Sequence, residues 1–143
     1  MPYRYREDIA TADIAFEAWG KTLEEMFIAA ADATMNVMVG DLDSIADRER
    51  RMIEVRSDEI DMLLFELLQE LIFFKDADML LLRIPAVTIE KERDHLVLTG
   101  EAYGEKIDPS KHELIVDVKA VTLHRFAVTQ IEEEWIASVI LDI

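Results

Sequence analysis

Two aspartates occupy positions where acidic side chains are uncommon. Asp142 follows the apolar run from Trp135 to Leu141, and Asp13 stands within the apolar run from Ala12 to Phe16. Acidic residues are depleted in β-strands, and they are seldom buried unless they are paired or bind a cation. If the two runs are neighbouring strands, both carboxylates and the terminal carboxylate of Ile143 form a cluster of oxygen atoms. Oxygen ligands favour a hard cation, so we expect Ca²⁺, with Mg²⁺ or Mn²⁺ as alternatives.

Simpler interpretations of these residues stay open. Asp13 suits a cap or turn at a strand end, and Asp142 suits a frayed, exposed chain end. Lys119 is a cation within the apolar run Val118 to Thr122. It fits a lysine at a sheet edge that extends its ammonium into water, or a counter-charge for a phosphate or an acid.

Common catalytic signatures are absent from the sequence. It has no Gly-rich phosphate loop, no His-Glu-x-x-His, no nucleophile elbow and no dinucleotide fingerprint. His95, His112 and His124 are isolated in sequence. We expect each to be exposed or a hydrogen-bonded structural histidine rather than a ligand.

Composition narrows the class of protein. With 143 residues, 51% of them apolar, and only 4 Gly and 3 Pro, we expect one ordered domain over residues 1–143. The net charge of −16 opposes direct binding to nucleic acid and favours cations or a basic protein surface. The absence of Cys excludes disulfides and thiolate sites. A charged N-terminus without a signal-peptide core, and no apolar run long enough for a membrane, predict a soluble cytoplasmic protein.

Hydrophobic periodicity predicts the elements that must position these residues. Residues 23–38 read as a helix with Thr22 and Glu25 as a capping box, and a second helix runs from Ile60 to about Lys75 with Ser57 or Asp58 as its cap. Period-two patterns predict strands at 12–19, 50–56, 79–91, 95–103, 115–130 and 135–142. Turns are expected at Glu92–Asp94, Asp108–Lys111 and Glu132–Glu134.

This order predicts an α+β fold, with two amphipathic helices packed on a largely antiparallel sheet. The strand–helix unit occurs twice, which suggests an internal duplication, although no residue-level repeat accompanies it.

The sequence resembles the archease family from end to end. The resemblance is carried by an ordered set of segments: Ala10-Thr11-Ala12-Asp13-Ile14-Ala15, Gly20-Lys21-Thr22-Leu23-Glu24-Glu25-Met26-Phe27, Leu63-Leu64 through Leu67, Gly100-Glu101, Lys119-Ala120-Val121-Thr122-Leu123-His124 and Leu141-Asp142-Ile143. Archeases are small acidic proteins that assist the GTP-dependent RtcB-type RNA ligase of tRNA splicing. The resemblance implies that this protein promotes guanylylation and turnover of the ligase and broadens its nucleotide use.

The resemblance also implies site residues. The metal site of the family matches Asp13, Asp142 and Ile143. The Lys of the family's Lys-Ala-Val-Thr segment matches Lys119, a candidate contact with the ligase or its nucleotide. Three departures occur. Ala10 stands where many members have His, Phe65-Glu66 stands where an aromatic residue is usual near Leu67, and Glu134 replaces the usual Gly before Trp135. The first departure puts a histidine contribution to the site in doubt, but it removes neither carboxylate.

The resemblance thus implies a ligase activator rather than an enzyme. Two other functions stay open: an independent metal-dependent hydrolase, and a non-catalytic module stabilised by a cation. The hydrolase would need a base and a substrate pocket, and the sequence shows no evident base beside the two acids.

Overall fold

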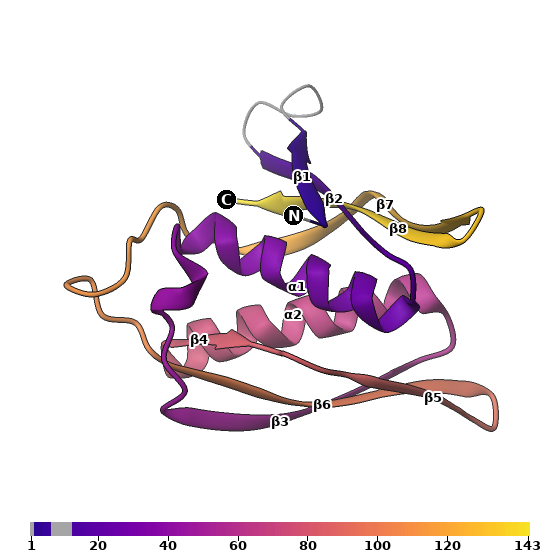
Figure 1. Ribbon diagram of the computed structural model, residues 1–143, viewed down its shortest axis with the longest axis horizontal. Helices are drawn as coiled ribbons and strands as arrows, with labels where there is room; N and C mark the ends of the chain where they lie inside the picture. Colours follow the sequence, from indigo (N-terminus) through magenta and orange to yellow (C-terminus); the bar gives the residue numbers. More distant parts are fainter. Residues whose placement is uncertain (1, 7–12) are drawn as a thin grey trace.

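In the part of the chain that the structure describes, two α-helices lie between two antiparallel sheets (Figure 1). The structure is a computed structural model that describes residues 2–6 and 13–143. One sheet has the strand order β1-β2-β8-β7; the other has the order β3-β6-β4, with β5 also paired to β6. The elements are β1 (Tyr3–Arg6), β2 (Asp13–Gly20), α1 (Leu23–Met38), a 3₁₀ turn η1 (Leu42–Ser44), β3 (Glu49–Ser57), α2 (Ile60–Asp78), β4 (Leu80–Arg83), β5 (Thr88–Glu92), β6 (His95–Lys106), β7 (Ala120–Ile131) and β8 (Glu134–Asp142).

Helix α1 begins at the predicted cap. The Thr22 side-chain oxygen accepts a hydrogen bond from the Glu25 N–H at 3.1 Å, and the Glu25 carboxylate accepts one from the Lys21 N–H at 3.1 Å. These bonds satisfy backbone donors that the first helical turn leaves free. The buried face of α1 is rich in alanine (Ala29, Ala30, Ala31 and Ala33), so the helix backbone packs close to its neighbours.

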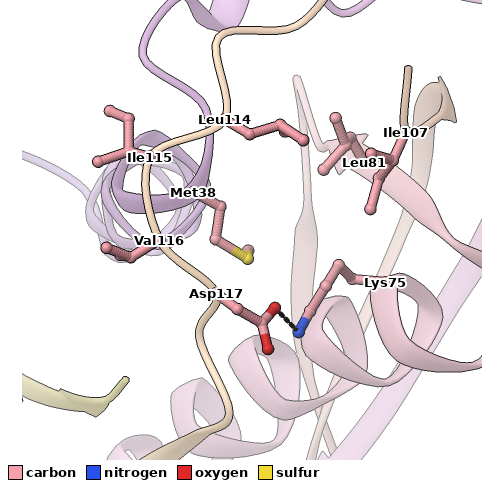
Figure 2. Close-up of a pocket in the computed structure, with 8 residues that line it drawn as sticks. All are labelled: Met38, Lys75, Leu81, Ile107, Leu114, Ile115, Val116 and Asp117. Atoms are coloured by element: carbon pink, nitrogen blue, oxygen red, sulfur yellow. Dashed lines mark hydrogen bonds and ion pairs between the residues drawn. The ribbon is translucent and has the colours of Figure 1, made fainter. Parts of the chain in front are cut away.

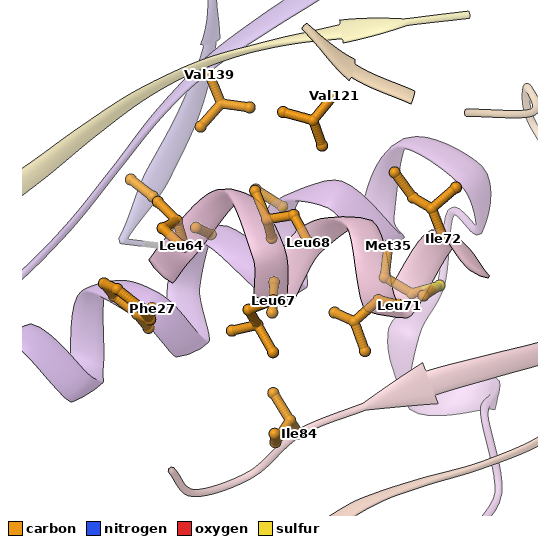
Figure 3. Packing of buried hydrophobic residues seen from close by; sticks show 14 of the residues in the cluster. Phe27, Met35, Leu64, Leu67, Leu68, Leu71, Ile72, Ile84, Val121 and Val139 are labelled. Carbon is orange, nitrogen blue, oxygen red and sulfur yellow. The ribbon is translucent and has the colours of Figure 1, made fainter. Parts of the chain in front are cut away.

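Helix α2 buries leucines toward both sheets. Figure 3 shows Leu64 and Leu68 directed toward Val139 and Val121 of the β1-β2-β8-β7 sheet, while Leu67 and Leu71 point the other way, toward Ile84. The α2 leucines at positions 63, 64, 67, 68 and 71 are all fully buried. A helix that must fill the space on two sides needs apolar residues over more than one stripe, which this leucine pattern supplies.

The predicted fold class is confirmed, and several boundaries are corrected. The expected strand at 79–91 is two strands, β4 and β5, separated at Pro85, which has no N–H to donate to a sheet. Helix α2 continues past Lys75 to Asp78 and ends where Met79 adopts a left-handed conformation with φ 57°. The residue that precedes α2 is Glu59, which makes no side-chain cap bond, so neither Ser57 nor Asp58 is the cap.

The expected strand at 115–130 begins only at Ala120. Among the described residues, the segment before it pairs with no strand apart from a bridge between Leu114 and Val39. Strand β6 runs to Lys106 rather than to residue 103, and β1 was not predicted. Residue 12, the expected start of the first strand, lies outside the described residues. Nothing in this topology confirms an internal duplication.

Truncation of a leucine between the sheets should destabilise the protein strongly. We expect Leu67→Ala to lower the free energy of unfolding by about 2–5 kcal/mol, because it removes buried methyl groups and leaves a cavity. Chemical denaturation measures the change. Leu123→Ala is the matched control, since Leu123 is 59% exposed on β7 and its loss should cost less than about 0.5 kcal/mol. Equal losses at the two positions would contradict the two-sided burial of α2.

Candidate metal centre

The antiparallel pairing of β2 with β8 makes Asp13 and Asp142 direct cross-strand neighbours. Residues that face each other across two strands project from the same face of the sheet, with Cβ atoms about 4.5–5.5 Å apart. Both aspartates are half-buried. Like charges in this arrangement repel each other, so the pair is unfavourable unless a cation or another donor lies between the carboxylates.

Apolar residues hold this register. Side chains that face the helices pair across β2 and β8 as Ile14 with Leu141, Phe16 with Val139 and Ala18 with Ala137. Phe16, Ala18, Val139 and Leu141 are buried in the core. A slip of one residue would turn this whole set to the opposite face, so burial fixes the register and with it the position of the two aspartates.

Lys119 and Ile143 lie beside the pair. The Lys119 N–H donates a hydrogen bond to the Asp142 carbonyl oxygen at 2.8 Å, and the Lys119 side chain is exposed. Ile143 follows β8 directly, and its half-buried side chain packs against the core. The structure therefore brings Asp13, Asp142, Lys119 and Ile143 to one end of the sheet. A metal-binding role for these residues stays a prediction. Ala10 lies outside the described residues.

The donor set fits a hard cation at a partly open site. Two carboxylates supply at most four oxygen atoms, whereas Ca²⁺ takes six to eight oxygen ligands and Mg²⁺ takes six. Within residues 2–6 and 13–143, no group of three or more His, Cys, Asp or Glu side chains is arranged for a metal. The remaining ligands would come from the oxygens of Ile143, from water, or from a group that a partner presents.

A second cluster of ionisable groups joins the end of β6 to the loop after it. Glu105 is buried, and its Oε2 accepts hydrogen bonds from Lys111 Nζ at 2.6 Å, the Ala46 N–H at 2.8 Å and His112 Nε2 at 2.9 Å. Nδ1 of His112 accepts from the Asp108 N–H at 2.9 Å, which places the ring proton on Nε2. The hydrogen bond from Lys111 and that from Ala46 outweigh burial and lower the pKa of Glu105 to about 2.

This cluster is structural. The Glu105 carboxylate already accepts three hydrogen bonds, so it is a poor general base. Its bonds with Lys111 and His112 hold the loop after β6 against the end of that strand. The expectation of a hydrogen-bonded structural histidine is confirmed for buried His112. His95 is exposed, and its Nδ1 lies 2.8 Å from Asp58 Oδ1. His124 is also exposed. The sequence did not identify Glu105, because its donors come from two separate segments, at Ala46 and at Lys111–His112.

Comparison with known proteins gives a consistent result over nearly the whole chain. The sequence model of the Archease protein family matches residues 3–143. The protein archease of Pyrococcus abyssi is 37% identical over 134 residues, which cover 93% of this chain and 94% of that protein. The protein archease of Methanopyrus kandleri is 32% identical over 143 residues and covers both chains fully.

Solved structures also match. The solution structure of Methanobacterium thermoautotrophicum protein 1598 superposes with a TM-score of 0.86 at 36% identity and covers 99% of each chain. The crystal structure of a Thermotoga maritima archease, described as a possible chaperone, has a TM-score of 0.62 at 21% identity and covers 96% of this chain and 97% of that one. The second match shows a shared fold. No helix in the described part of this chain is long and apolar enough to cross a membrane.

Calcium should stabilise the protein through the aspartate pair. We expect Ca²⁺ to raise the melting temperature of the parent above its value in chelator, since a ligand that binds only the folded state stabilises it. Asp13→Asn should remove this response. In chelator the same variant should be as stable as the parent or more stable by about 0.2–1 kcal/mol, because the repulsion is relieved. Asp94→Asn, in the turn between β5 and β6, is the control and should keep the response. An unchanged calcium effect in Asp13→Asn would contradict the site.

Stability should fall in acid through Glu105. Its pKa lies below the ordinary 4.5 in the folded state, so its contribution is complete above pH 4.5 and is lost as the pH falls toward about 2. Glu105→Gln should lower the free energy of unfolding at neutral pH by about 1–3 kcal/mol. It should also flatten the decline between these two pH values. Denaturation at a series of pH values measures both effects. Glu66→Gln on the exposed side of α2 is the control, and an identical acid profile in the two variants would contradict the assignment.

Proposed function

The chain belongs to the archease family, and from this membership we propose that it is an accessory activator of a GTP-dependent RtcB-type RNA ligase in tRNA splicing. In this proposal it promotes guanylylation and turnover of the ligase and does not itself join RNA. The activity depends on a divalent cation held by Asp13, Asp142 and Ile143. The cytoplasm is the expected location.

One observation carries the proposal beyond family membership: the cross-strand pairing of Asp13 with Asp142. The pair costs stability through repulsion unless a cation is present, and it leaves coordination positions for ligands from outside the chain. A site that only stabilised the fold would gain from a complete set of ligands. An incomplete set suits a protein that offers its cation to a partner's phosphate groups.

The residues of the chain have distinct roles in this proposal. Asp13 and Asp142 hold the cation, and the packing of β2 against β8 keeps their carboxylates in place. When bound, the cation would act as a Lewis acid toward phosphate oxygens. Lys119 adds a second positive charge beside Asp142, where its exposed ammonium can reach a nucleotide or an acidic group on the ligase. The net charge of −16 steers the protein to a basic surface and disfavours contact with bare RNA.

A reconstituted ligase reaction tests the function. The pure protein should speed formation of the ligase–GMP adduct and permit multiple turnover when it is added to a matched RtcB-type ligase, GTP and Mn²⁺ or Mg²⁺. Asp13→Ala should abolish this stimulation with little loss of fold, because it removes a ligand and no core volume. Lys119→Ala should weaken it, and Asp94→Ala should not. Stimulation should decline as salt rises, because screening shortens the reach of the acidic field.

Other outcomes separate the alternatives. Hydrolysis of RNA or nucleotide by the protein alone, lost in Asp13→Ala, would support a metal-dependent hydrolase. Cation-dependent stability without any effect on matched ligases would leave a structural module. Residues added after Ile143 should impair stimulation more than folding; equal stimulation by the extended protein would show that the terminal oxygens of Ile143 are not needed.

A further inference from the structure

Three consecutive aliphatic side chains are exposed on the segment between β6 and β7. Leu114, Ile115 and Val116 are 45%, 57% and 37% exposed, and no other consecutive run of exposed large hydrophobic residues occurs in the described part of the chain. Isolated apolar residues on a surface are ordinary, whereas a contiguous group is typical of a surface that binds a partner.

The backbone of this segment is fixed on one side and open on the other. The Ile115 N–H donates to the Met38 carbonyl oxygen at 2.9 Å, and the Gly40 N–H donates to the Glu113 carbonyl oxygen at 2.9 Å. Within residues 2–6 and 13–143, the next N–H along the chain, that of Val116, makes no hydrogen bond. The segment is thus held against the end of α1 on one side and keeps a free backbone donor, which suits the addition of an extended chain.

A narrow pocket opens beside the segment, and Figure 2 shows its walls. Its volume is about 220 Å³, below the 300 Å³ at which small-molecule sites usually begin. One long side chain fits such a space better than a metabolite does. Met38, Leu81, Ile107 and Leu114 form apolar walls, and Lys75 and Asp117 lie together at one end.

That end carries one uncompensated negative charge. The Lys75 ammonium is buried and lies 2.6 Å from Asp117 and 2.5 Å from Asp76, so two carboxylates share one cation. Burial acts to lower the pKa of Lys75, and the hydrogen bonds with Asp117 and Asp76 outweigh it and raise that pKa. The side chains of Asp117 and Asp76 are 65% and 57% exposed and accessible to a second cation.

Residues 114–117 and the pocket beside them form a groove. We propose that this groove binds an extended segment of a partner protein in which lysine or arginine alternates with aliphatic residues. One long basic side chain enters the pocket: its methylene stem contacts Met38, Ile107 and Leu114, and its charged head reaches Asp117. Aliphatic neighbours of that side chain cover Ile115 and Val116, and the partner's backbone accepts from the free Val116 N–H.

A second copy of this chain fits the groove less well. A two-fold interface brings the same patch of both copies together, so Asp117 and Asp76 would face acidic residues between two molecules of charge −16. The inference rests on the proposed function for the existence of a protein partner. It adds the chemistry that such a partner presents, and it places the docked segment next to Lys119, which leads directly to Asp142.

Binding of short peptides tests the groove without any ligase present. The probe is the acetylated, amidated peptide Val-Lys-Val-Lys-Val, titrated into isotopically labelled protein while amide resonances are followed by NMR. Shifts should concentrate at Met38 and at residues 114–117. Ser-Lys-Ser-Lys-Ser, of equal charge, and Val-Glu-Val-Glu-Val should bind at least tenfold more weakly.

Paired variants decide whether the binding is specific. Ile115→Ser should weaken binding of the probe at least fivefold, whereas Leu123→Ser, which removes an equally exposed aliphatic side chain from β7, should change it less than twofold. Asp117→Asn should weaken binding more than Asp94→Asn. If Asp117→Asn unfolds, Ile115→Ser and the peptide controls decide the question.

Absence of binding, equal binding of the serine peptide, or shifts centred elsewhere would overturn the groove. None of these results would decide whether the protein stimulates the ligase. Conversely, specific binding of the probe together with failure to stimulate any matched ligase would support the peptide-binding groove and reject the proposed function.

Discussion

The pairing of β2 with β8 is the constraint on which the rest of this structure depends. These two strands form the centre of their sheet, with β1 on one side and β7 on the other. Their helix-facing side chains fill the core above α1, and their other face carries Asp13 and Asp142 in register. Burial of Phe16 and Val139 therefore determines where two acidic groups from opposite ends of the chain meet. The hydrophobic effect stabilises the position, and electrostatic repulsion is the cost that a cation would relieve.

The segment from Glu105 to Lys119 connects the site to the second sheet and is anchored at both ends by buried charge. At one end Glu105 accepts from Lys111 and His112; at the other, Lys75 donates to Asp117 and, at 2.8 Å, to the Val118 carbonyl oxygen. Buried ionic groups contribute little net stability, but they tolerate few alternative arrangements. This explains how a stretch with almost no sheet hydrogen bonds presents a defined row of aliphatic side chains and delivers Lys119 to Asp142.

Local sequence patterns predicted much of the fold and part of the site. The Thr22–Glu25 cap and the leucine spacing from Leu63 to Leu71 predicted both helices, because helix formation follows from neighbours three and four residues apart. Asp13 and Asp142 were identified because acids are rare in apolar strands. Long-range contacts were not predictable in this way. Residues 115–119 alternate like a strand, yet no strand in the described part of the chain pairs with them. Glu105 gave no signal because its donors lie far from it in sequence or outside its own strand.

The element order has a consequence for how the protein is made. Asp13 and Asp142 are close in space although nearly the entire chain separates them, and β8 is synthesised after every other strand and helix described here. Closing so large a loop has a high entropic cost, and folding slows as contacts become more distant in sequence. While the ribosome is still adding β7 and β8, β1 and β2 have no central partner, and the leucines of α2 that will face β8 remain exposed. Folding of this sheet is therefore a late event in synthesis, and the nascent chain is vulnerable to aggregation until β8 emerges.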